Sequence, residues 1–184
     1  MGKTFKHVLF AFLPLALAIT LLCLIFYTAI QQSYRISAND PQIQLAEDIA
    51  TQLANGNPSA YYIPPVKIDI SKSLGTFIMI FDSNGKLVNS SASLDGKSPQ
   101  IPVGLFGTAK KSGETRITWQ PQKNARIALV VVHYKNAKEG FVAIGRSLRE
   151  VEKRIDSLTK IVFFGWAFTL LSVFVLLYLQ KKGS

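Results

Sequence analysis

Two long stretches of the chain consist of apolar and small residues without a single charge. The first runs from Val8 to Ile30, 23 residues, and the second from Ile161 to Leu179, 19 residues. As helices that rise about 1.5 Å per residue, they are about 35 and 28 Å long, enough to cross a hydrocarbon layer of roughly 30 Å. The pattern predicts two transmembrane helices, at residues 8–30 and 161–180.

A cleaved signal peptide is the alternative interpretation of the first apolar stretch. Lys3 and Lys6 precede the stretch, and the Ala-Leu-Ala triplet at 16–18 resembles a cleavage site. Cleavage there would leave residues 19–30 as an apolar N-terminus, and the whole stretch is longer than the apolar region of a signal peptide. The sequence therefore favours a retained anchor.

The helical and strand patterns between the spans predict one compact outer domain. Asp40-Pro41 begins a helix that ends at Asn55-Gly56, and Asp82-Ser83-Asn84-Gly85 supplies the turn of a β-hairpin. This order predicts an α+β fold with an antiparallel sheet of five short strands and flanking helices. The expected elements are a helix at 41–54, strands at 76–81 and 86–90, a short helix at 102–111, and strands at 114–119, 125–134 and 140–146.

The charges set the expected orientation in the membrane. The chain has 21 Lys and Arg against 11 Asp and Glu, a net charge of +10, which on a small protein raises the possibility of nucleic-acid binding. By the positive-inside rule, however, the basic tails at 1–7 and 181–184 are expected in the cytoplasm and residues 31–160 outside it. The outer segment carries net +6 and does not meet cytoplasmic nucleic acid. Four basic residues lie in the tails, which hold no acid: Lys3, Lys6, Lys181 and Lys182.

One family resemblance is carried by the hairpin FIMIFDSNGKLVNSS, the helical stretch after it, and the run WQPQKNARIALVVVHYKNAKEGFVAIGRSLREVEKRID that leads into the second span. These features are similar to the extracytoplasmic PAS-like (Cache) sensor region of bacterial histidine kinases and chemoreceptors. The resemblance covers most of 40–160 and both spans. It implies a PAS-like sheet held between two transmembrane helices in the bacterial inner membrane, with a ligand-sensing domain that acts on the second span.

The expected function follows from this resemblance and from the short tails. Neither tail can hold a kinase or another effector, which is a departure from the usual sensor architecture. We therefore expect a sensor that signals through its second span to a separate membrane protein such as a histidine kinase or receptor. The alternative is an accessory or assembly protein that uses the outer domain as a docking surface for a membrane complex.

A helical seam connects the outer domain to the second span. Its positions recur every three or four residues, apolar before the span and mostly small within it, a composition typical of helix interfaces in water and in lipid. The seam fits packing against the chain's own first span, and equally against a second protomer in a homodimer or against a partner protein. Its members are Leu148, Val151, Ile155, Leu158, Val162, Gly165, Thr169 and Ser172.

Candidate ligand contacts come from the central strands and from the proline-rich loop before the hairpin. In the strand at 125–134, alternation places Arg126 and Tyr134 on one face and His133 on the other. A pocket with aromatic walls and one cation suits a small carboxylate or amino-acid-like ligand. Each candidate also fits a structural role in the core or at the surface. The candidates are Trp119, Arg126, His133, Tyr134, Tyr61 and Tyr62.

The sequence nominates no catalytic residue, metal site or cofactor. His133 is the only histidine outside the expected cytoplasmic tails, and the only cysteine, Cys23, lies in a span. The outer segment therefore offers no thiolate nucleophile and no multi-histidine metal site. A serine paired with His133 stays open, but the G-x-S-x-G arrangement is absent from the sequence. We expect a binding protein and not an enzyme.

Overall fold

The computed structural model of the chain describes residues 2–123 and 125–183. These residues divide into two compact units. One is a helical pair formed by the segments up to Tyr34 and from Lys153 onward, and the other is a domain, Arg35–Glu152. The predicted outer segment, 31–160, includes this domain and extends beyond it by four residues at its start and eight at its end.

The helical pair consists of most of α1 (Gly2–Ser37) and α4 (Arg149–Gly183). Both helices are long and apolar enough to cross a membrane, judged by length and composition. Large apolar side chains on both are exposed to the surroundings, for example Phe10 at 83% and Phe168 at 72%. Helices that expose such surfaces require an apolar environment around them, which fits a membrane protein.

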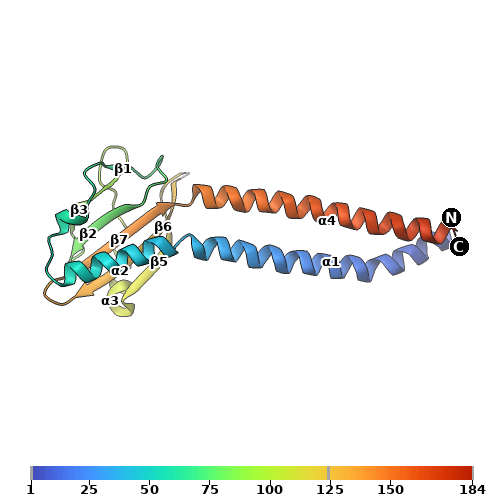
Figure 1. Ribbon diagram of the computed structural model, residues 1–184, viewed down its shortest axis with the longest axis horizontal. Helices are drawn as coiled ribbons and strands as arrows, with labels where there is room; N and C mark the ends of the chain where they lie inside the picture. The colour runs from blue at the N-terminus through green and yellow to red at the C-terminus, as the bar shows by residue number, and fades with distance from the viewer. Residues whose placement is uncertain (1, 124, 184) are drawn as a thin grey trace. The chain divides into compact units, whose positions relative to one another are not determined.

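The domain combines helices with a five-stranded antiparallel sheet, as predicted (Figure 1). The sheet order is β3-β2-β7-β6-β5, so β2 lies beside β7, the last strand of the chain, and β3 is an edge. The predicted helix, hairpin, short helix and three further strands are all confirmed. The elements are α2 (Asp40–Ala54), a 3-10 turn η1 (Ser59–Tyr62), β1 (Ile68–Asp69), β2 (Phe77–Asp82), β3 (Leu87–Ser90), β4 (Ala92–Ser93), α3 (Gly104–Ser112), β5 (Glu114–Gln122), β6 (Ala125–Lys135) and β7 (Glu139–Ser147).

One face of the sheet is covered by α2. Ala46, Ile49 and Leu53 recur on one side of this helix and are nearly inaccessible to solvent. They pack with Val130 and Val132 of β6 and with residues of β2 and β7. Asn39, not Asp40, is the N-cap residue, and it makes no side-chain capping bond. The stability of α2 therefore comes mainly from its buried face.

The other face of the sheet is covered by α3 and by the segments around it. The Phe106 ring of α3 lies with its centroid 4.9 Å from the rings of both Phe81 and Phe141. Leu129 and Val131 of β6 belong to the same buried cluster. Alternate residues of β6 therefore pack into the two cores on opposite faces of the sheet, as the alternation predicted. Side chains fill both faces.

The sequence did not predict the short parallel pair of β1 and β4. Ile68 N donates to Ser91 O at 2.7 Å, and Ile70 N donates to Ser93 O at 2.9 Å. Each strand has only two residues, too few to show an alternating pattern. The pair is nevertheless important because it fixes the end of the proline-rich loop beside the sheet.

Candidate functional site

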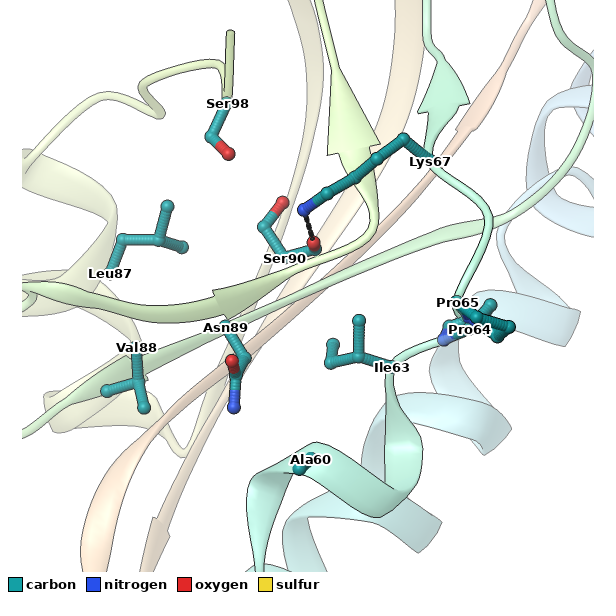
Figure 2. A pocket seen from close by; sticks show the side chains of 10 residues that line it. All are labelled: Ala60, Ile63, Pro64, Pro65, Lys67, Leu87, Val88, Asn89, Ser90 and Ser98. Carbon is teal, nitrogen blue, oxygen red and sulfur yellow. Dashed lines mark hydrogen bonds between the residues drawn. The ribbon is translucent and has the colours of Figure 1, made fainter.

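A surface groove lies between the proline-rich loop and the edge strand β3 (Figure 2). Its volume is about 440 Å³. Figure 2 shows residues 87–90 of β3 along one side and Ile63, Pro64 and Pro65 opposite them. The residues that line it are Ala60, Ile63, Pro64, Pro65, Lys67, Leu87, Val88, Asn89, Ser90 and Ser98.

Hydrogen bonds hold the loop beside β3 at both of its ends. Asn89 Nδ2 of β3 donates to Ser59 Oγ of η1 at 2.6 Å. Asn57 Nδ2 donates to Gln52 Oε1 at 2.7 Å, which links the start of the loop to the end of α2. At the far end, the β1–β4 pair joins the loop to the chain after β3. The two prolines between these ends, at 64 and 65, restrict the backbone, so the groove is largely pre-formed.

Among the described residues that line the groove, Lys67 is the only cation. Its ammonium group donates to the backbone oxygen of Ser90, and Figure 2 shows the side chain extended toward the strand. A lysine ammonium has three donor hydrogens, so two remain for a ligand. Among the described lining residues there is no acidic side chain, and the Ser98 hydroxyl has no hydrogen-bond partner within the described part of the chain. The groove therefore presents donors and positive charge.

The nearest acid in sequence, Asp69, is already engaged by its own turn. Asp69 Oδ1 accepts hydrogen bonds from Ser71 Oγ at 2.6 Å and from Ser71 N at 3.0 Å. These hydrogen bonds, with a smaller contribution from Lys72, lower the pKa of Asp69 below its ordinary value. Because its carboxylate is satisfied in this way, Asp69 is a poor competitor for the Lys67 ammonium.

The groove has the composition of a binding site. Ile63, Leu87 and Val88 with the two prolines supply apolar walls, while Lys67, Asn89 and Ser98 supply polar contacts. Mixed lining of this type fits a small amphipathic anion, since apolar walls hold the ligand body and a few polar groups fix its orientation. The described lining residues include no cysteine and no histidine to act as nucleophile or base.

The six ligand contacts predicted from the sequence do not share this groove or one common pocket. Trp119 is buried in the core under α3, whereas Tyr134 is buried in the core under α2. Burial raises the pKa of the Tyr134 hydroxyl, and the nearby Asp82 carboxylate adds to the effect. These two residues occupy opposite faces of the sheet, where they contribute to packing. Their contact with a ligand stays a prediction.

His133 and Arg126 lie at the two ends of β6 and bind acidic side chains of the domain. His133 Nε2 lies 3.2 Å from Glu139 Oε1, and Lys110 of α3 forms an ion pair with the same oxygen at 2.9 Å. Hydrogen bonds from Lys110 and then His133 lower the pKa of Glu139. Arg126 Nη1 lies 2.5 Å from Glu152 Oε1. Both candidates therefore connect elements of the fold.

Tyr61 and Tyr62 lie in η1, beside the groove but outside its lining. Tyr61 is 79% exposed. The Tyr62 hydroxyl accepts a hydrogen bond from Asn57 Nδ2 at 3.3 Å, and its ring packs at the margin of the core under α2. The two tyrosines thus lie in the loop that borders the groove without lining it, and their contact with a ligand stays a prediction.

The groove residues that the sequence did not single out are Lys67, Asn89 and Ser98. A lysine after a Val in a proline-rich loop has no distinguishing sequence pattern. Its significance comes from the hydrogen bond to Ser90, a residue 23 positions away. The one usable signal was the proline pair itself, which indicates a rigid segment.

Within the helical pair, α1 and α4 pack against each other. Trp166 Nε1 donates to Thr20 Oγ1 at 3.0 Å, and the Tyr27 hydroxyl lies 3.0 Å from Thr159 Oγ1. Phe12 and Phe174 form an edge-to-face pair with centroids 5.4 Å apart. The chain's own first helix is thus one partner of α4.

Only some residues of the predicted seam are partly buried. Leu158 and Val162 are partly buried, whereas Gly165 and Thr169 are exposed, and nothing lies within 4 Å of a Cβ built on Gly165. Leu148, Val151, Ile155 and Ser172 are also partly buried. Packing of the exposed small residues against a second protomer stays a prediction.

Comparisons with known proteins show a distant structural likeness. No protein-family model matches the chain, and no curated protein matches it. Among solved structures, the chain is similar to the ligand-binding domain of the amino-acid chemoreceptor PctC from Pseudomonas aeruginosa PAO1 in complex with GABA. The identity is 14% and the TM-score 0.45, over 74% of this chain and 62% of that one. The chain therefore spans less than two thirds of the solved chain that it matches.

Proposed function

We propose that the protein is a membrane-anchored sensor whose outer domain binds a small carboxylate in the groove beside β3. The observation that carries this proposal is the Lys67 ammonium, which is directed to the strand edge in a groove with apolar walls and no acid among its described lining residues. A hydrogen bond from a charged donor contributes about 1.5–3 kcal/mol. Loss of the ammonium should therefore weaken carboxylate binding about 10- to 150-fold.

A continuous hydrogen-bonded route leads from the groove to the start of α4. Ser90 of β3 pairs with Met79 of β2, which pairs with Ala143 of β7. β7 then leads into α4 through Leu148, whose backbone N–H donates to Arg126 O at 2.8 Å. The ion pair between Arg126 and Glu152 ties the first turn of α4 to β6. A ligand that shifts β3 would thereby act on α4.

The proposed placement in the cell follows from the two apolar helices and the basic ends. The chain resides in a bacterial inner membrane, with the domain outside the cytoplasm. The start of α1 and the end of α4 lie in the cytoplasm. In this arrangement α4 passes the binding event to a separate membrane protein, such as a histidine kinase or receptor.

A thermal-shift screen of the full chain in detergent tests the sensor proposal. The panel is a set of small carboxylates, each paired with its uncharged amide. At a concentration of 100 times the dissociation constant, a bound carboxylate should stabilise the protein by about 2.7 kcal/mol, whereas its amide should not. The variant Lys67→Met should lose this response, and Lys111→Met, which removes an exposed lysine on α3, should retain it. A panel without any shift, or an undiminished response in Lys67→Met, would refute the proposal.

The second candidate function, a docking surface for a membrane complex, is favoured by one observation. Val88 in the lining of the groove is 53% exposed and Val66 beside it is 73% exposed, and both lie at the edge strand β3 or in the loop next to it. However, β3 is short, its pairing with β2 contains a register shift, and the Ser90 carbonyl already accepts a hydrogen bond from Lys67. Such features protect a sheet edge from strand addition, so a small ligand is the better fit.

A further inference from the structure

A second hollow lies within the helical pair, between α1 and α4. It has a volume of about 290 Å³ and is lined by Tyr34, Lys153, Arg154, Ser157, Leu158 and Ile161. All six residues belong to the helical-pair unit, so the hollow is formed entirely by that unit. It is distinct from the groove beside β3.

The hollow extends across the boundary between the apolar and polar parts of both helices. Ile161 is the first residue of the second uncharged stretch, and Tyr34 lies four positions after Ile30, the last residue of the first stretch. Arg154 lies seven positions before Ile161, about 10 Å along the helix axis. Headgroups occupy a layer of roughly 5–8 Å on each side of a bilayer. On the proposed membrane placement, the hollow therefore extends from the apolar boundary at Ile161 through the outer headgroup layer. The backbone of Arg154 lies just beyond this layer, and its long side chain can reach back into it.

The lining of the hollow is complementary to an anionic phospholipid. Lys153 and Arg154 supply positive charge, Tyr34 and Ser157 supply hydroxyl groups, and none of the described lining residues is acidic. Arg154 makes no ion pair with any described residue. The nearby Asp156 is already paired with Lys160 at 2.7 Å. A guanidinium group matches two phosphate oxygens through its planar pair of N–H donors.

We propose that this hollow binds one outer-leaflet phospholipid, with its phosphate between Lys153 and Arg154 and an acyl chain along Leu158 and Ile161. The apolar floor identifies a lipid and not free phosphate as the occupant, because Ile161 is 70% exposed and continues into the apolar surface of the span. Basic sites between membrane helices bind lipid headgroups by the same chemistry. The inference rests on the proposed membrane placement, and is independent of whether the groove binds a carboxylate.

Native mass spectrometry of the full chain tests this lipid site. The protein is released from micelles that contain phosphatidylglycerol, or phosphatidylcholine as the zwitterionic comparison. The wild type should retain one phosphatidylglycerol, and the double variant Lys153→Gln/Arg154→Gln should bind it about 10- to 30-fold more weakly. The matched variant Lys181→Gln/Lys182→Gln loses the same charge at the other end of α4 and should bind as the wild type does. Arg154→Lys, which keeps the charge but loses the planar pair of donors, should give an intermediate affinity.

Three results would overturn the site. These are equal retention of both lipids, unchanged retention in the Lys153→Gln/Arg154→Gln variant, and complete displacement of the lipid by inorganic phosphate. Unfolding curves that coincide with those of the wild type show that the double variant is folded. Alkaline extraction tests the membrane placement, on which the lipid site rests, by a separate measurement. Release of the chain from vesicles would overturn the membrane placement itself.

Discussion

Phe106 provides a quantitative test of whether the face of the sheet under α3 is filled with side chains or able to open into an internal pocket. Its side chain is 8% exposed, and its ring lies 4.9 Å, centroid to centroid, from those of Phe81 and Phe141. Substitution Phe106→Ala removes a buried ring that rigid neighbours on two strands cannot replace. Truncations of this kind cost about 3–5 kcal/mol. For a domain of this size the melting temperature should fall by roughly 12–20 °C.

The assay is urea unfolding of a fragment that covers Arg35–Glu152, the compact unit that contains both cores. Trp119 is the only tryptophan of the fragment and lies in the same cluster as Phe106, so its fluorescence reports directly on this core. Val103→Ala, at an 80% exposed position just before α3, is the control and should change stability by less than about 0.5 kcal/mol. A loss below about 1 kcal/mol in Phe106→Ala would show that this face is loosely packed, and would move the expected ligand site to the interior.

Two further predictions concern close packing and pH. Gly145→Ala should destabilise the domain by about 1–3 kcal/mol in the same assay, because its Cβ would lie 2.3 Å from the ring of Phe77; Gly107→Ala on α3, where a Cβ meets nothing within 4 Å, should be neutral or stabilising. The pKa of Glu139 is lowered by its hydrogen bonds from Lys110 and His133. Its contribution to stability is therefore present above the ordinary pKa of 4.5 and is lost as the pH falls through the lower folded value. Glu139→Gln should accordingly lose less stability than the wild type between about pH 5 and pH 3, and equal pH slopes would contradict this assignment.

Much of the fold was predictable because its signals are local. The turn at 82–85 has the Asp and Gly residues that a hairpin requires, and Asp82 Oδ1 accepts hydrogen bonds from the backbone of Asn84 and Lys86 at 2.9 Å each. In the structure, Val130 and Val131 belong to opposite cores, which is the alternation expected along β6. These features depend on residues that are close in sequence or that repeat with the period of a strand.

The groove was not predictable, because it depends on contacts between distant segments. Lys67 gains its role from Ser90, and the loop gains its position from the bond between Asn89 and Ser59. The contact between α1 and α4 shows the same limit, whereas packing of the predicted seam against a second protomer stays a prediction. A repeat of three and four residues predicted Gly165 as an interface position, but an α-helix has 3.6 residues per turn, so a strict heptad pattern drifts around a straight helix. In the structure, the neighbouring Trp166 makes the hydrogen bond to α1.

Hydrogen–deuterium exchange of the full chain is the most direct test of the central claim that the groove beside β3 is the ligand site. The measurement compares the protein alone with the protein saturated by the carboxylate that stabilises it most. A ligand in this groove predicts slower exchange at residues 60–67 and 87–90, with smaller changes at 147–152 where β7 leads into α4, and no change across α3. Slower exchange in α3 and around Trp119, with residues 87–90 unaffected, would contradict it.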